Sequence, residues 1–132
     1  MIKVRKHFAA IMIFATMPCA ALAQAVTLTD CAKLPHVDGL YTCEVRNDTQ
    51  TAIAAVSYTP EVTKKGRSVP FVVRGSLPPI TRAIPGGIEP GETMPVTMTT
   101  AFYPSDSQRD GLEVTFHILA ILDVDGKSIE LN

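Results

Sequence analysis

The chain has 132 residues, of which 12 are Lys or Arg and 13 are Asp or Glu, so its formal net charge is −1 at pH 7. A chain of this length suffices for one domain with one hydrophobic core and is too short for two. Because the charges balance and no basic patch is large enough to bind a phosphate backbone, nucleic acid is excluded as the expected partner.

The N-terminus has the three-part pattern of a secretory signal peptide. Basic residues lie within positions 3–6, an apolar stretch follows at 8–17, and positions 21–23 read Ala-Leu-Ala, the form that signal peptidase recognises. The apolar stretch is shorter than the ~20 residues that span a bilayer, which disfavours a retained anchor and predicts no stable membrane span after cleavage. We therefore expect a signal peptide in residues 1–23 and a periplasmic or secreted bacterial protein formed by residues 24–132.

Cleavage would make the protein more acidic. It removes three of the 12 basic residues and none of the 13 acidic ones, so the mature net charge becomes −4. The chain contains no Trp, and sites that stack sugars or single-stranded bases normally need more aromatic surface than it offers. The core is therefore expected to consist mostly of Val, Ile, Leu and Met.

Two cysteines, Cys31 and Cys43, remain in the mature chain. In an oxidising compartment they are expected to form a disulfide, and closure of this short loop would stabilise the fold by about 3 kcal/mol. A redox pair would normally have C-x-x-C spacing, which these residues lack. A zinc site would need two further ligands, and His36 is the nearest candidate.

The first part of the mature chain shows a period of two residues, typical of β-strands. A weak strand pattern covers residues 25–29. In residues 41–46, apolar side chains alternate cleanly with polar ones, which predicts a strand with one buried and one solvated face. Residues 47–50 then read as a turn. A second strand is predicted at 51–58, although small or apolar residues occupy both of its faces.

The middle of the chain is rich in turn residues. Residues 60–67 form a charged connection, and a strand is predicted at 68–74. Pro70 lies inside that strand and cannot donate a ladder hydrogen bond, which indicates an edge strand or a bulge. A short strand is predicted at 80–84. The prolines and glycines within 85–91 are strong turn signals that should end it.

The last part of the chain carries the clearest strand patterns. Residues 92–100 alternate, and Pro95 again indicates an edge strand. Residues 112–124 form the longest pattern, with the even-numbered side chains on one face. Because its middle is apolar on both faces, we expect a central strand. Asp125-Gly126 is a hairpin signal that predicts a returning strand at 128–131.

About seven strands separated by regular turn signals predict an all-β, antiparallel sandwich. The segment 47–53 follows a strand, and Ile88-Glu89-Pro90-Gly91-Glu92 precedes one. This arrangement resembles small bacterial secreted domains of immunoglobulin-like or fibronectin-type-III-like fold, in which a strand ends in an Asn-containing turn and a Leu-x-Pro-Gly-Glu turn leads into a Thr/Val-rich strand. The chain departs from antibody-type domains because it lacks a core Trp and its cysteines are too close to bridge two sheets. The resemblance implies a fold and no function.

The histidines provide the candidates for catalysis. His117 shares a predicted strand face with Glu113, and a general base formed with Glu113 or Asp123 is conceivable. Residues two apart on a strand lie ~7 Å apart, too far for a direct hydrogen bond. No motif places a serine or cysteine nucleophile beside His117, and His36 is expected in an exposed loop. We therefore predict that the protein is not an enzyme and has no catalytic residues.

No metal or cofactor site is predicted. Residues 123–126 resemble the start of a calcium-binding loop, but Gly126 comes too early for an EF-hand, and a hairpin turn is the simpler interpretation. Met94 and Met98 are soft ligands that suit copper(I), yet two methionines on a strand more commonly pack in a core.

Charged loops offer the candidate partner contacts. Lys64, Lys65 and Arg67 form a basic cluster in one connection, and Asp106 and Arg109 belong to a later polar loop. The alternative interpretation is that each group belongs to a solvated loop that contacts no partner. We predict these five residues as possible contacts with another exported or envelope protein.

The leading hypothesis is a non-enzymatic exported binding module whose partner and oligomeric state the sequence leaves open. The predicted edge strands 68–74 and 92–100 offer a second way to contact a partner, although their prolines disfavour strand pairing. One alternative is a small periplasmic hydrolase or metal-dependent enzyme that uses His117. Another is an inhibitor of an exported enzyme that inserts the loop 104–111 or the segment 31–43.

Overall fold

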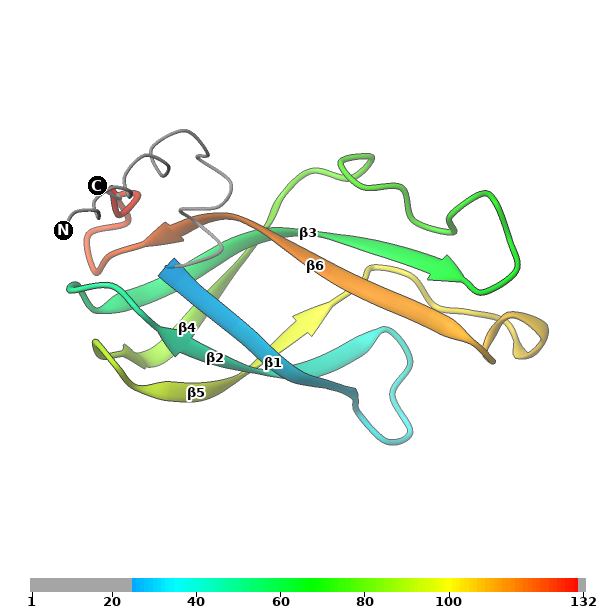
Figure 1. Ribbon diagram of the computed structural model, residues 1–132, viewed down its shortest axis with the longest axis horizontal. Helices are drawn as coiled ribbons and strands as arrows, with labels where there is room; N and C mark the ends of the chain where they lie inside the picture. The colour runs from blue at the N-terminus through cyan, green and yellow to red at the C-terminus, as the bar shows by residue number, and fades with distance from the viewer. Residues whose placement is uncertain (1–24, 131–132) are drawn as a thin grey trace, which may run out of the picture.

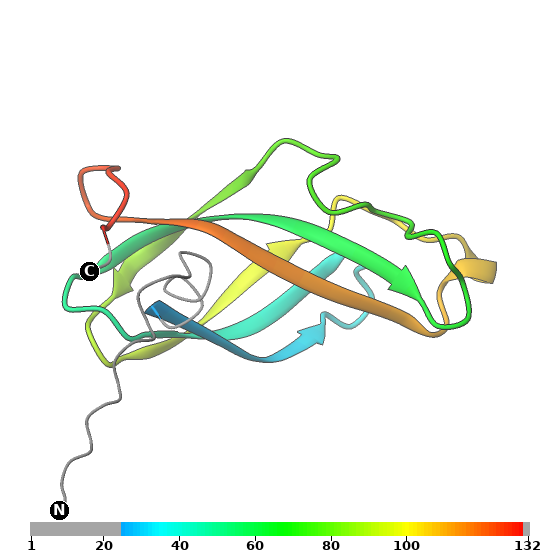
Figure 2. The ribbon, with the colours of Figure 1, turned by 45° about the horizontal axis from the view of Figure 1, so that its top comes forward.

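A computed structural model describes residues 25–130 of the chain. Two three-stranded antiparallel sheets pack face to face as a sandwich (Figures 1 and 2). The strands are β1 (Val26–Lys33), β2 (Leu40–Asn47), β3 (Ile53–Lys64), β4 (Ile80–Ile88), β5 (Thr93–Thr99) and β6 (Leu112–Leu122). The all-β sandwich is thus confirmed, with six strands in these residues. The predicted signal peptide lies outside them, and within residues 25–130 no helix is long and apolar enough to cross a membrane.

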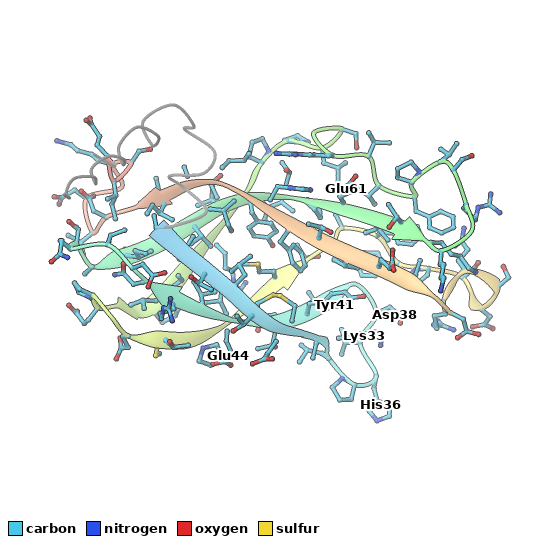
Figure 3. All side chains as sticks on the ribbon, in the orientation of Figure 1. Lys33, His36, Asp38, Tyr41, Glu44 and Glu61 are labelled. Carbon is cyan, nitrogen blue, oxygen red and sulfur yellow. A yellow bond between two sulfur atoms is a disulfide. The ribbon has the colours of Figure 1, made fainter. Side chains whose placement is uncertain are left out.

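The first sheet has the strand order β1-β2-β5, and the disulfide lies within it. Thr29 faces Glu44 and Ala32 faces Thr42, so two residues of β1 lie opposite Cys43 in a β-bulge. One of them is Cys31, which bonds to Cys43 as predicted. The loop from β1 to β2 carries exposed His36 at its tip (Figure 3). At the other edge, β5 confirms that residues 92–100 form an edge strand.

The second sheet has the order β4-β3-β6, with the 12-residue β3 at its centre. The sequence predicted a strand that ends at Tyr58, whereas β3 continues through Pro60 to Lys64. Proline is tolerated here because its missing N–H lies on the side of β3 that faces away from β6. The N–H of Val62, two residues later, lies on that same side and bonds to Val72. β4 pairs with β3 only as far as Tyr58, so no ladder bond is lost at Pro60.

β6 is an edge strand, although its sequence predicted a central one. The reason is a β-bulge: Ser57 faces Ala120 and Tyr58 faces Ile118, so Leu119 is an extra residue. Beyond the bulge the inward and outward faces exchange. Ile121 is therefore buried, although it lies outside the predicted even-numbered face. The strand ends at Leu122, and Val124 is 77% exposed.

Two further predicted strands are reduced to single bridges. In residues 68–74, only Val72 pairs, with Val62, and the exposed fractions of Val69 and Val73 are 68% and 50%. Ser128 forms an isolated bridge with Leu122 in place of the predicted strand 128–131, whose last residue is outside the described range. The predicted inward face of 68–74 is therefore wrong, since Val72 is buried and its neighbours Val69 and Val73 are exposed.

β4 runs through the prolines and glycines that were expected to end it. Ile53 of β3 faces Ile88, and Ala55 faces Ala83, so residues 84–87 bulge out of the ladder. Gly87 has φ +68°, and a Cβ there would lie 3.0 Å from the carbonyl oxygen of Ile53. The turn signals therefore create a bulge within one strand.

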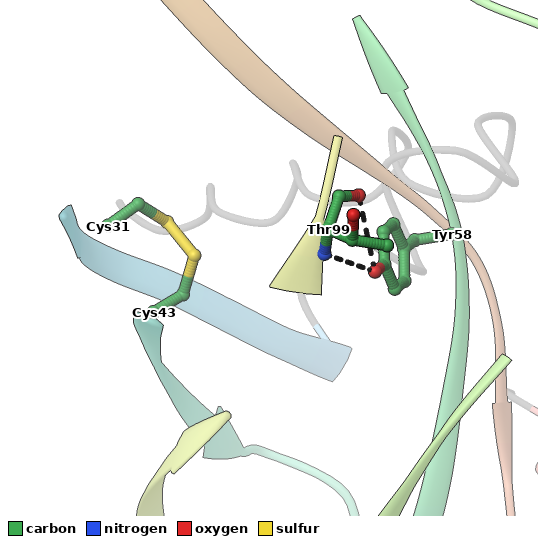
Figure 4. The surroundings of a disulfide bond; sticks show 4 residues. All are labelled: Cys31, Cys43, Tyr58 and Thr99. Atoms are coloured by element: carbon green, nitrogen blue, oxygen red, sulfur yellow. Dashed lines mark hydrogen bonds between the residues drawn. A yellow bond between two sulfur atoms is a disulfide. The ribbon is translucent and has the colours of Figure 1, made fainter. Parts of the chain in front are cut away.

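Two buried polar side chains tie the sheets together. Asn47 at the end of β2 donates from Nδ2 to the carbonyl oxygens of Thr51 (2.9 Å) and Ile88 (2.8 Å), and its Oδ1 accepts from Thr49 N–H at 2.8 Å. Its side chain is fully buried with every polar group bonded. Tyr58 of β3 crosses to β5, where its hydroxyl accepts from the N–H of Thr99 at 2.8 Å (Figure 4).

Candidate binding site at the loop end of the sandwich

The structure brings together the two groups of partner-contact residues that the sequence predicted separately. β3 ends at Lys64, opposite Leu112 at the start of β6, so the loops that flank these positions share one end of the sandwich. The Lys64 Nζ donates to the carbonyl oxygen of Ser107 at 3.1 Å. The backbone N–H of Lys65 donates to the carbonyl oxygen of Gly111 at 3.3 Å. We call this region, made by the loops 34–39, 64–67 and 100–111, the loop end.

Arg109 organises the charges of the loop end. Its Nη2 lies 2.8 Å from Asp38 Oδ2, and its Nη1 contacts Asp106. Lys33 Nζ lies 3.5 Å from the other oxygen of Asp38. The hydrogen bond from Arg109, helped by the nearby positive charge of Lys33, lowers the pKa of Asp38. The carboxylates in turn raise the pKa of Arg109. Arg109 thus fastens the late loop to the loop between β1 and β2.

A cleft of about 340 Å³ opens between the two sheets at the loop end. Apolar side chains from both sheets line it, among them Tyr41 of β2 and Val114 of β6. Its charged lining residues are Lys33, Arg109 and Asp110. Figure 3 shows Lys33, Asp38 and Tyr41 close together at this end. Burial, and then the negative charge of Asp38, raises the pKa of the Tyr41 hydroxyl. The cleft therefore offers apolar contact beside a charged rim.

One wall of the cleft is held in place by close packing. Phe102 lines the cleft and stacks on Phe71, with ring centroids 5.3 Å apart. The guanidinium of Arg67 lies 5.8 Å from the centroid of the Phe71 ring, within reach of a cation–π contact. Gly39 has φ +82°, and a Cβ there would come within 2.9 Å of the Phe102 carbonyl oxygen. Only glycine fits this position without displacing Phe102.

His117 lies elsewhere, with a partner that the sequence did not predict. Its Nε2 is 2.9 Å from Oε1 of Glu61, which β3 supplies on the adjacent strand. The expected partners were Glu113 and Asp123; the Oδ1 of Asp123 instead accepts backbone N–H bonds from Asp125 and Lys127 in the hairpin turn. Because side chains alternate along a strand, Glu61 points to the face opposite Val62, away from the cleft that Val62 lines.

Within residues 25–130, no group of three or more His, Cys, Asp or Glu side chains could hold a metal ion. The sequence reasoning missed Lys33, Asp38, Tyr41 and Phe102. The dipeptide Asp38-Gly39, directly before a strand, is a turn signal that could have drawn attention to this loop.

Comparisons with known proteins gave no relative. No protein-family model matches the chain, and the comparisons with curated proteins and with solved structures found no match. The sandwich architecture stands on the structure itself, and its immunoglobulin-like character stays a prediction from turn chemistry.

Proposed function

We propose that the protein is an exported, non-enzymatic binding module whose loop end contacts another exported or envelope protein. The observation that carries this proposal is the convergence of the two predicted contact loops around one apolar cleft. An apolar centre with a charged, solvated rim is the usual anatomy of a protein–protein interface.

The charges of the loop end suit a partner with acidic and apolar groups. Asp38 and Asp106 already neutralise Arg109, which therefore fixes the loops. Lys65 and Arg67 are exposed. The backbone of Lys65 bonds to Gly111, which lines the cleft, and the guanidinium of Arg67 lies over Phe71, the ring that stacks on Phe102. A partner loop that inserts an apolar side chain into the cleft would place its carboxylates near these two cations.

The test is capture of partners from a periplasmic extract by the immobilised mature protein. The double variant Lys65→Gln, Arg67→Gln removes two loop-end charges and keeps the contact of Lys64 with Ser107. We expect the amount of any specifically captured protein to fall by at least about tenfold, since charges at an interface rim steer and orient association. If it captures the same proteins in the same amounts as the wild type, the loop end is not the binding site.

The matched control is the double variant Arg82→Gln, Lys127→Gln. It removes the same charge, but β4 and the hairpin after β6 carry these residues, away from the loop end. Capture should be unchanged in this control. If both double variants lose capture equally, binding depends on net charge alone and the proposal fails. A captured hydrolase whose activity falls on binding would identify the module as an inhibitor.

A further inference from the structure

The four edge strands of the sandwich differ in how they are protected against pairing. β1 carries the disulfide-linked bulge, and β5 contains Pro95. β4 contains Pro85 and a bulge, and its register places Arg82 on the same face as buried Val56. Prolines, bulges and inward-pointing charges are the usual devices that block edge-to-edge pairing. β6 has neither proline nor glycine, and from Leu112 to Ile118 its ladder with β3 is regular.

Hydrogen bonds define which backbone groups of β6 are free. The Gly111 carbonyl oxygen accepts from the backbone N–H of Lys65, whereas Val62, which faces Val114, directs its own N–H and C=O to Val72, away from β6. The odd-numbered residues of β6 therefore direct their backbone groups toward β3. The even-numbered residues therefore direct theirs to the open edge. They are Leu112, Val114, Phe116 and Ile118. The bulge then reverses the direction, and the carbonyl oxygen of Ile121 is taken by the N–H of Ile129.

We infer that β6 pairs antiparallel with β6 of a second copy of this chain, with the twofold axis at Thr115. This register sets Leu112 opposite Ile118 of the second copy and Val114 opposite Phe116 of the second copy. Both are hydrogen-bonded pairs, and each occurs twice, which gives about eight interchain hydrogen bonds. Every outward N–H and C=O from Leu112 to Ile118 is then satisfied. The β4-β3-β6 sheet of one copy and that of the second copy become one continuous sheet.

The outer-face side chains select the same register. With the axis at Thr115, Glu113 lies directly opposite His117 of the second copy, an acid facing a base on both sides of the axis. An axis at position 113 would set Glu113 against Glu113, and an axis at position 117 would set His117 against His117. Like charges directly opposite one another disfavour pairing. The axis at Thr115 avoids the Glu113–Glu113 contact and sets each Glu113 opposite an imidazole whose Nε2 already bonds to Glu61 of its own chain. Backbone and side chains therefore agree on one arrangement.

The association state of the mature protein with its disulfide intact tests this inference. Sedimentation velocity across a range of concentrations should show a dimer. Thr115→Lys sets two lysines against each other at the axis and should abolish it; Thr115 is exposed, so the fold should tolerate the change. Thr81→Lys places the same charge on the outer face of β4, at the opposite edge of the sheet, and should leave the dimer intact. A monomeric wild type, or a Thr115→Lys variant that still dimerises, overturns the inference.

Cysteine cross-linking checks the register independently. Only a residue on the axis meets its own copy, so Thr115→Cys should form an interchain disulfide on mild oxidation. Glu113→Cys and Thr81→Cys should not, and Thr81→Cys also controls for exchange with the Cys31–Cys43 bond. Equal cross-linking of all three variants would rule out the proposed axis. The loop-end capture experiment uses different residues, so either proposal can fail without the other.

Discussion

The two ends of the sandwich are closed by different physical means. At the Asn47 end, a fully buried amide bonds to backbone groups of three other residues and ties β2 to β4. At the loop end, buried Thr100 bonds to the Gly39 carbonyl oxygen within one sheet, whereas the link between the two layers is made by ion pairs around Arg109, beside an open cleft. Buried hydrogen bonds are costly to break, whereas surface ion pairs contribute little stability. We therefore expect the Asn47 end to contribute more to stability than the loop end does.

The strongest challenge to this contrast is Asn47→Ala. The change leaves the carbonyl oxygen of Ile88 and the N–H of Thr49 without their partner. Buried groups left unsatisfied cost about 1–3 kcal/mol each, so we expect a loss of about 3 kcal/mol in the free energy of unfolding. Urea denaturation measures it. Gln50→Ala, an exposed neighbour in the same turn, should change the free energy of unfolding by less than about 0.5 kcal/mol. Similar values for the two variants would remove the assigned role of Asn47.

Gly39→Ala tests whether the loop end also contains a rigid element. The added Cβ would meet the Phe102 carbonyl oxygen at 2.9 Å in a backbone of positive φ. We expect a loss of about 2 kcal/mol, because the strained conformation and the displaced Phe102 both add to the cost. Thermal unfolding gives the stability, and near-ultraviolet circular dichroism reports the packing of Phe102. Gly66→Ala, where a Cβ meets nothing within 4 Å at a similar φ, isolates the cost of the backbone alone. Equal losses in both variants would show that the Phe102 contact has no effect.

Arg109→Gln should have the smallest effect and the clearest dependence on pH. Arg109 lowers the pKa of Asp38 in the folded chain below its usual 3.8. A carboxyl group whose pKa falls on folding stabilises the fold above its unfolded pKa, and that stability is lost as the pH falls through the folded value. The variant should therefore have a lower urea midpoint than the wild type at pH 7, and the difference should shrink below pH 3.8. Arg74→Gln is the control for loss of an exposed arginine. A difference that persists unchanged in acid would contradict the assignment.

The sequence predicted the features that depend on local pattern. Period-two alternation identified the strands around Cys43 and Val96. The two cysteines that follow the predicted signal peptide indicated the disulfide between them. The edge position of β6 could not be predicted, because the bulge at Leu119 exchanges its faces and so produces the same pattern as burial on both sides. The contact of Arg109 with Asp38 joins residues 71 positions apart in the chain. No periodicity indicates such a pair, since only the packing of the two sheets determines which loops meet.

The disulfide joins neighbouring strands of one sheet, so within residues 25–130 the two layers are linked covalently only by the backbone itself. Loss of this bond would release the register of an edge strand and leave the packing between layers to the apolar core, Asn47 and Tyr58. Strands β2 to β6 can therefore assemble without the disulfide, and its formation then fastens the N-terminal strand β1. Hydrogen exchange in reducing buffer would accordingly be fastest in β1, while the amides of β3 would remain protected.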